Sequence, residues 1–245
     1  MKKEYGFILI AYIVMQLSSF VGVPLVQFIG TFLGQSPEEM QSLAVPYWLV
    51  ISFSITLIFV LFLLRKEYNN ENNIRNAAST SSSISWAIIG IFLAFFAQTV
   101  AAKIELLLGI ESGSENTEQI INLIEQFPII ILISSVIGPI LEEIVFRKII
   151  FGSLFNRFGF FLSALISSVI FSLAHLEPEH VILYSTMGFT FAFLYVKTKR
   201  ILVPIFAHVA MNTMVVLVQS VFREDLERMI KEAEQIQGFI GGFFL

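Results

Sequence analysis

Long apolar runs separated by short polar segments dominate the chain. Seven runs reach or approach the roughly 20 residues that a helix needs to cross a membrane. They cover residues 5–33, 47–64, 86–108, 127–155, 160–176, 181–196 and 201–222. The pattern predicts an all-α fold, a polytopic transmembrane helix bundle with about seven spans, of which the fifth and sixth are the shortest.

Composition supports a membrane protein over a soluble one. Of the 245 residues, 56% are hydrophobic and only 14% are charged, whereas a soluble domain is about a quarter charged. These few charges cannot cover the surface of one or two soluble domains. The net charge of −4 gives no indication of a nucleic-acid partner. We therefore expect a multi-pass protein of the cell membrane, in contact with lipid and without nucleic acid.

The loop charges predict how the chain is oriented. One set of alternate loops holds most of the basic residues, namely Lys2, Lys3, Arg65, Lys66, Arg75, Lys148, Arg157, Lys197, Lys199 and Arg200. The intervening loops are mainly acidic and contain Glu38, Glu39, Glu111, Glu115, Glu118, Glu125, Glu177 and Glu179. The positive-inside rule places the N-terminus in the cytoplasm and the C-terminus outside. Residues 223–237 mix charged and apolar positions and predict a helix on the outer surface.

Charged residues inside the predicted fourth span are functional candidates, because burying charge in a membrane is costly. The turn after this span centres near residues 157–158, with Glu142 about 15 residues before it and His175 about 17 after it. In an antiparallel hairpin both side chains then lie roughly 22–26 Å from the turn, at the same level. Glu143 and Arg147 have the i,i+4 spacing of an ion pair, which leaves Glu142 as the free carboxylate. The alternative is a structural clamp of both acids with Arg147.

His208 and Asn212 share one face of the predicted seventh helix, again at i,i+4 spacing. The amide could fix the tautomer of the imidazole, although a lone membrane histidine can also be a packing residue. Counted from Ile201, His208 lies only about 10 Å deep, which disagrees with the hairpin estimate. A hairpin projecting into the cytoplasm would reconcile the two depths, and residues 177–180 would then line the cavity.

Several protease classes are excluded by the residues themselves. The chain has no cysteine, no H-E-x-x-H zinc motif and no G-x-S-x-G elbow. Its single aspartate, Asp225, lies in the tail, so an aspartyl dyad inside the membrane is excluded. Glutamate, histidine and asparagine remain as candidates.

Three short motifs stand in order on separate predicted helices. Residues 142–147 read E-E-I-V-F-R, residues 171–175 read F-S-L-A-H, and residues 208–212 read H-V-A-M-N. In motif order and spacing the chain resembles the CAAX-protease and bacteriocin-processing (CPBP/Abi) family of intramembrane peptidases, over about residues 127–218. The resemblance implies a catalytic four-helix core in 127–222. The apolar runs and charges predict N-terminal transmembrane helices and their loops in residues 1–126 and a surface amphipathic tail in 223–245.

The resemblance also implies an endopeptidase that cleaves a hydrophobic, membrane-associated peptide or protein precursor. Glu142 would be the base that activates water. The other implied catalytic residues are His175, His208 and Asn212, and the supporting residues are Glu143, Arg147 and Phe171.

The role of a metal stays open at this point. His175 and His208, together with a carboxylate, could ligate Zn²⁺ and leave one position for water. The same groups could activate water and stabilise an oxyanion without a metal, and water activation by Glu142 is the reading we prefer.

Two non-proteolytic functions compete with this interpretation. The first is a membrane scaffold or bacteriocin-immunity protein on the same fold, although binding alone requires no level Glu–His pair. The second is a transporter or proton relay, although the sequence lacks the repeats and paired broken helices of many transporters.

Overall fold

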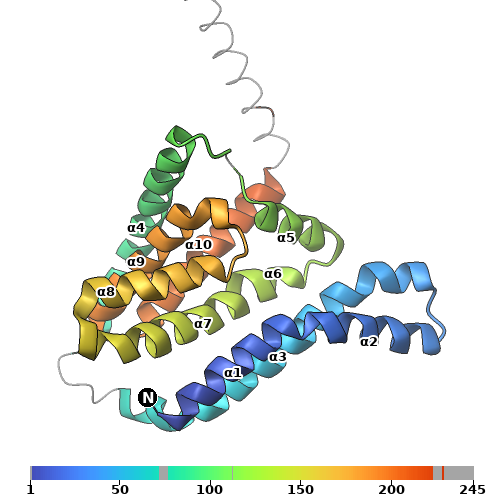
Figure 1. The fold of residues 1–245 in the computed structure, drawn as a ribbon, viewed down its shortest axis with the longest axis horizontal. Helices are drawn as coiled ribbons and strands as arrows, with labels where there is room; N and C mark the ends of the chain where they lie inside the picture. Colours follow the sequence, from blue (N-terminus) through green and yellow to red (C-terminus); the bar gives the residue numbers. More distant parts are fainter. Residues whose placement is uncertain (1, 72–76, 112, 223–227, 229–245) are drawn as a thin grey trace, which may run out of the picture.

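The computed structural model describes residues 2–71, 77–111, 113–222 and 228, and this part of the chain contains helices and no strand (Figure 1). The α-helices are α1 Lys3–Leu17, α2 Ser19–Phe32, α3 Pro37–Glu71, α4 Thr80–Leu107, α5 Glu115–Gln126, α6 Ile130–Leu132, α7 Gly138–Glu142, α8 Gly152–Leu173, α9 Val181–Thr198 and α10 Leu202–Val221. Two π-helices, η1 Ile133–Ile137 and η2 Glu143–Phe151, flank α7, and a 3-10 turn, η3 Pro178–His180, precedes α9.

The all-α membrane bundle is confirmed. Among the described residues, four helical stretches are long and apolar enough to cross a membrane, and they cover Pro37–Arg65, Thr80–Leu107, Pro178–Thr198 and Leu202–Ser220. The pair α1 and α2 passes the same test together, bent by 54°, which brings the number to five. The predicted first span is therefore a broken helix, and the total of seven stays a prediction.

The two predicted spans that fall short of this test have physical reasons to do so. The fourth carries Glu142, Glu143, Arg147 and Lys148 on a helix whose pitch changes twice. The fifth begins directly after Gly159, a kink in α8 with a φ of 69°, and α8 ends at Leu173, so the straight part of the helix is shorter than a membrane span. Glycine reaches this left-handed region without a steric penalty. The kink forms the predicted turn of the hairpin, close to residues 157–158.

Capping residues explain where α3 and α5 begin, which the pattern of apolar runs did not predict. The second span was predicted over 47–64, but α3 begins at Pro37, where Ser36 and Glu39 form a capping box. The Glu39 amide donates to Ser36 Oγ at 3.1 Å, and the Ser36 amide donates to Glu39 Oε2 at 3.3 Å. Helix α5 was not predicted at all. Ser114 caps it by accepting from the Thr117 amide at 3.0 Å.

The helices form one bundle with an arm. Helix α1 packs on α3 and on η2, while α9 packs against α4 and α8, and α10 packs against α4, α9, η1 and α7. In Figure 1, α2 and the first part of α3 extend away from the rest of the bundle. Helix α4 belongs to the predicted N-terminal part, yet it contacts two helices of the predicted catalytic core. The boundaries at 126 and 222 stay predictions.

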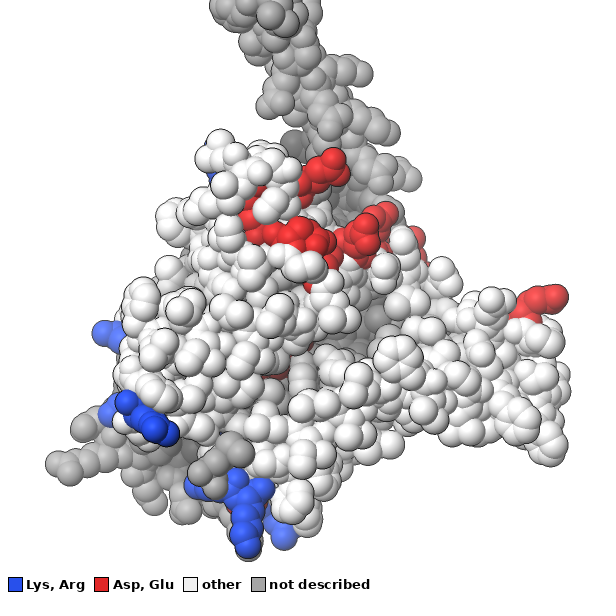
Figure 2. Space-filling model, viewed as in Figure 1, with Lys and Arg blue, Asp and Glu red and all other residues white. Residues whose placement is uncertain are grey.

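Charge is distributed unevenly over the surface. Figure 2 shows the acidic side chains gathered around α5 and at the tip of the arm, and the basic ones gathered at the opposite end, near the start of α1. This separation agrees with the alternation of loop charges, and the orientation of the chain in the membrane stays a prediction. The predicted tail helix, residues 223–237, lies outside the described residues apart from Arg228.

Candidate active site

The first motif lies where the helical pitch changes. Glu142 ends α7 and Glu143 begins the π-helix η2. Pro139 stands at the start of α7 and has no N–H, so the regular hydrogen-bond pattern is interrupted between η1 and η2. π-Helical turns are rare and frequently occur at functional sites. The irregular helix thus marks the same segment as the charged motif.

A fully buried carboxylate organises this region. Glu143 and Arg147 are both 0% exposed, and Arg147 Nε lies 3.2 Å from Glu143 Oε2. The other oxygen, Oε1, lies 3.0 Å from His208 Nδ1. The structure therefore brings the predicted Glu143–Arg147 pair together and adds His208 to it. Because a carboxylate accepts hydrogen bonds, His208 Nδ1 is the donor in this contact.

Aromatic rings surround the Arg147 guanidinium. Its carbon Cζ lies 4.3 Å from the centre of the Phe171 ring, 5.5 Å from Phe191 and 5.9 Å from Phe146. Within the described part of the chain, its Nη1 and Nη2 atoms have no hydrogen-bond partner. The charge is compensated by Glu143 and by ring faces. This gives Phe171 the supporting position that the second motif predicts.

Glu142 occupies a different environment from its neighbour. Its side chain is 21% exposed, and its Oε2 atom lies 3.8 Å from His208 Nε2. This separation is too long for a direct hydrogen bond. One imidazole thus faces both acids, with Nδ1 on the buried Glu143 and Nε2 toward Glu142. Of the two adjacent carboxylates, Glu142 is the one that water can reach.

His175 lies at the level predicted from the hairpin. The Phe146 and Phe171 rings meet edge to face at 5.2 Å, and Ser167 Oγ donates to the Phe146 carbonyl oxygen at 2.6 Å. Glu142 precedes Phe146 by four residues and His175 follows Phe171 by four, so the antiparallel register sets them level. His175 Nδ1 donates to the Phe171 carbonyl oxygen over 2.9 Å, which leaves Nε2 available.

Asn212 does not hold His208 in this structure. It lies half-buried one turn after His208, and its side chain makes no hydrogen bond with any residue that the structure describes. Glu143 fixes the imidazole tautomer instead. The expectation that Asn212 orients His208 is therefore not what the geometry shows.

Sequence reasoning missed a polar layer at the acidic end. Tyr184 stacks on His175 with ring centres 4.0 Å apart and donates to Glu177. Glu177 also accepts from Ser114 Oγ at 2.8 Å and from the Asn116 amide at 2.9 Å. Burial opposes its ionised form, but these donors hold the pKa of Glu177 below its usual value. Tyr184, which stacks on the ring of His175, is thereby linked through Glu177 to the start of α5.

Residues 177–180 were expected to line a cavity, and two of them instead hold helices together. His180 Nδ1 lies 2.8 Å from Glu105 Oε2, and the Leu183 amide donates to Glu105 Oε1 at 2.8 Å. Glu105 is buried in α4, so this cluster joins α4 to the beginning of α9. A single tyrosine or glutamate in an apolar run carries no periodic signal, which is why these contacts were missed.

The donor set does not form a metal site by itself. Among the described residues, no three His, Asp or Glu side chains gather closely enough to share an ion, whereas a catalytic zinc takes three protein ligands. His175 and His208, predicted as zinc ligands, belong to no such group. These residues alone therefore do not supply the three protein ligands that a catalytic zinc requires.

Comparison with known proteins places this geometry in a family. The profile of a family described as type II CAAX prenyl endopeptidase Rce1-like matches residues 124–214, which include every predicted site residue. A Bacillus subtilis (strain 168) protein named "Putative membrane peptidase YdiL" is 47% identical over 249 aligned positions, covering 100% of both chains. The chain belongs to the CAAX-protease family of membrane peptidases.

A second CAAX-family relative is the Staphylococcus aureus (strain USA300) protein named "Membrane-embedded CAAX protease MroQ". It is 32% identical over 93% of this chain and 95% of its own length. No solved structure gives a significant match. The resemblance read from the three motifs is thus confirmed, and this CAAX-family chain is a multi-pass membrane peptidase.

Proposed function

We propose that the chain hydrolyses a peptide bond in a membrane-associated peptide or protein precursor, with Glu142 activating the water. The observation that carries the proposal is the unequal environment of two adjacent carboxylates. Glu143 is 0% exposed and bound to Arg147 and His208, whereas Glu142 is 21% exposed and faces His208 Nε2. A buried acid serves as an anchor, and an accessible acid beside an imidazole serves as a base.

The reaction uses each side chain in one role. Glu142 takes a proton from water, and the resulting hydroxide attacks the scissile carbonyl carbon. The Asn212 amide, as a donor, stabilises the oxygen of the tetrahedral intermediate. His175 Nε2, whose lone pair is free while Nδ1 donates to Phe171, accepts a hydrogen bond from the attacking water. The proton held by Glu142 then passes to the leaving amine as the C–N bond breaks. Glu143 and Arg147 act only by holding His208 beside this centre.

The substrate class follows from the setting and from the relatives. The chain is a membrane peptidase, so its substrate must reach a site among apolar helices. The family description and the name of the S. aureus relative both refer to CAAX proteolysis, which supports a hydrophobic or lipid-anchored peptide tail as substrate. A scaffold or immunity protein would bind such a tail and release it uncut.

Reconstituted protein is expected to cut a membrane-associated peptide into two fragments, detected by mass spectrometry. We expect a strong chelator to leave the rate unchanged and elemental analysis to give far less than about one zinc per chain, since a catalytic zinc needs three protein ligands. The metal-free mechanism would be contradicted if the protein held about one zinc per chain, lost its activity when the zinc was removed and regained it when zinc was added. Stoichiometric binding of the peptide without release of fragments would contradict the proposed peptidase activity.

A further inference from the structure

Three contacts fix the imidazole of His175, a side chain that is only half-buried. Its Nδ1 atom donates to the Phe171 carbonyl oxygen over 2.9 Å, and the Phe171 ring meets it edge to face with ring centres 4.6 Å apart. The ring of Tyr184, on α9, stacks on it with centres 4.0 Å apart and planes 26° apart. Residues of two helices, α8 and α9, thus set the direction in which His175 Nε2 points.

Tyr184 is itself held through its hydroxyl. This group donates to the Glu177 carboxylate, which also accepts from Ser114 Oγ at 2.8 Å and from the Asn116 amide at 2.9 Å. Glu177 is only 6% exposed, and these three donors compensate its charge. Hydrogen bonds to an ionised acceptor are roughly twice as strong as those between neutral groups. The Tyr184 ring is therefore held more firmly than by packing alone.

The backbone between His175 and Glu177 adopts a conformation that these contacts explain. Leu176 has a φ of 59°, in the left-handed region that residues with a side chain rarely adopt. Its own side chain is 86% exposed, so packing of that side chain does not cause the conformation. A strained backbone persists only where its surroundings determine it, and such residues cluster at active sites. Here the contacts of His175 and Glu177, one residue on either side, supply the constraint.

We propose that Tyr184, tethered by Glu177, is a positioning residue that directs His175 Nε2 at the attacking water. The inference rests on the proposed function, in which Nε2 accepts a hydrogen bond from this water. The stacked ring keeps the imidazole from rotating, so the bond from Nδ1 to Phe171 and the direction of Nε2 are maintained together. In this role Tyr184 acts through His175 and not on the substrate. It therefore affects the rate after substrate binding rather than substrate affinity.

Replacing Tyr184 with leucine removes the stacked ring. We expect kcat to fall about 100-fold while KM changes little, because misplacing a catalytic group by about 1 Å can cost that much. Tyr184→Phe keeps the ring and loses only the tether, so we expect kcat to fall roughly tenfold. Glu177→Ala should match Tyr184→Phe. Combining these two changes should cost little more than either, since both break the same hydrogen bond.

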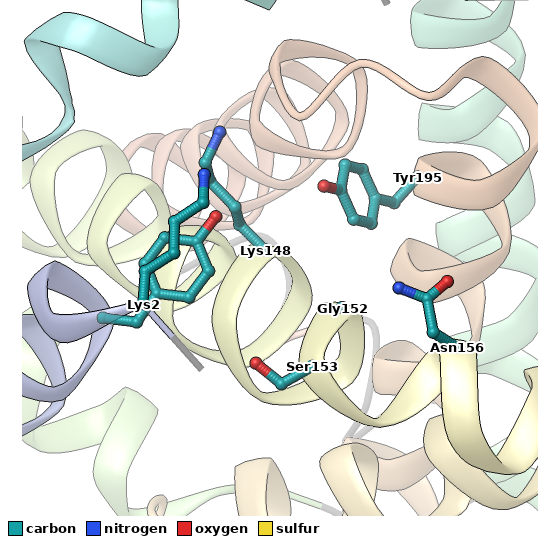
Figure 3. Close-up of a pocket in the computed structure, with 7 residues that line it drawn as sticks. Lys2, Lys148, Gly152, Ser153, Asn156 and Tyr195 are labelled. Carbon is teal, nitrogen blue, oxygen red and sulfur yellow. The ribbon is translucent and has the colours of Figure 1, made fainter.

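Tyr195→Leu is the matched control, because it makes the same substitution about three turns further along α9. Figure 3 shows Tyr195 at a polar cavity that Lys2 and Lys148 also line, at the basic end of the bundle. Its ring packs near Phe151 and not on a predicted site residue. The control should keep the wild-type kcat. An equal fall in kcat for Tyr195→Leu and Tyr184→Leu would show a general effect of α9 packing and would count against the proposal.

The orientation of His175 can also be measured without any proteolytic assay, so its failure is distinct from failure of the proposed function. The chain contains three histidines, and the ring ¹⁵N signals of labelled full-length protein in detergent report which nitrogen carries the hydrogen. We expect wild-type His175 to show the Nδ1–H form and Tyr184→Leu to show a mixture of both forms.

Unchanged His175 signals in Tyr184→Leu would overturn the proposal, as would a wild-type kcat in Tyr184→Phe. The phenylalanine variant keeps the ring, so it tests the tether even if Tyr184→Leu folds poorly. Wild-type protein that holds His175 in the Nδ1–H form but cuts no peptide would contradict the proposed function and leave the tether in place.

Discussion

Replacing Glu142 with glutamine is expected to abolish peptide cleavage while the protein stays folded. The amide keeps the size of the side chain but cannot take a proton from water. Loss of a positioned general base typically slows a reaction by about 100-fold or more. The fold should survive, because Glu142 is 21% exposed and the buried ion pair belongs to Glu143 and Arg147. The measurement is the single-turnover rate in liposomes, with folding checked by size-exclusion chromatography.

Glu179→Gln provides a matched control for this experiment. Glu179 is an exposed glutamate in η3 and lies outside the contacts of His208, so its variant should cleave at the wild-type rate. If Glu142→Gln kept more than about a tenth of the wild-type rate, its assignment as the base would be wrong, given the size of the effect expected for a base.

Replacing Arg147 with alanine is expected to prevent most of the protein from folding. Removing one partner of a buried ion pair leaves an uncompensated charge and typically costs about 3–5 kcal/mol. Here the stranded group would be Glu143, at 0% exposure. The change would also empty the space between the Phe171 and Phe191 rings. Folded yield from the membrane and the unfolding temperature in detergent measure the effect.

Two further variants show whether charge is the cause. Arg157→Ala removes an exposed arginine near the Gly159 kink and should leave the yield unchanged. The double variant Arg147→Met with Glu143→Gln removes both buried charges and should recover part of the folded yield. A normal yield of Arg147→Ala, with full cleavage activity, would refute a structural role for the pair.

The sequence predicts the hairpin of the site well, because that part depends on local rules. Gly159 supplies the turn, and equal helix lengths on either side bring Glu142 level with His175. The i,i+4 spacing likewise predicts the contact of Glu143 with Arg147. These features need only helix geometry and a turn residue.

The role of His208 could not be predicted in the same way. Its bond to Glu143 depends on how α10 is rotated against a helix 65 residues away in sequence. The amide of Asn212, one turn along the same helix, looked the nearer partner. In the folded structure, the packing of α10 brings His208 to the buried carboxylate of Glu143 instead.

The π-helices and α5 were missed for related reasons. An apolar run has the same composition whether it forms an α-helix or a π-helix. Apart from Pro139, the sequence therefore contains nothing that predicts η1 and η2. Helix α5 is amphipathic rather than apolar, and it buries Ile121 and Ile124 on one side. A search for membrane-length runs passes over such a segment. The contacts of Glu177 and Tyr184 that anchor it are likewise invisible in sequence.

The most direct test of the central claim compares membrane peptidomes of cells that carry the wild-type protein, the Glu142→Gln variant or no protein. If the chain is a peptidase that uses Glu142, the variant and the null strain accumulate the same uncut precursor and lack the same fragments. The variant must reach the membrane at the wild-type level, which immunoblotting establishes. The opposite result is a Glu142→Gln peptidome identical to that of the wild type, with a changed peptidome only in the null strain. It would show that the function needs the protein but not the Glu142 carboxylate, and it would contradict the assignment of Glu142 as the catalytic base.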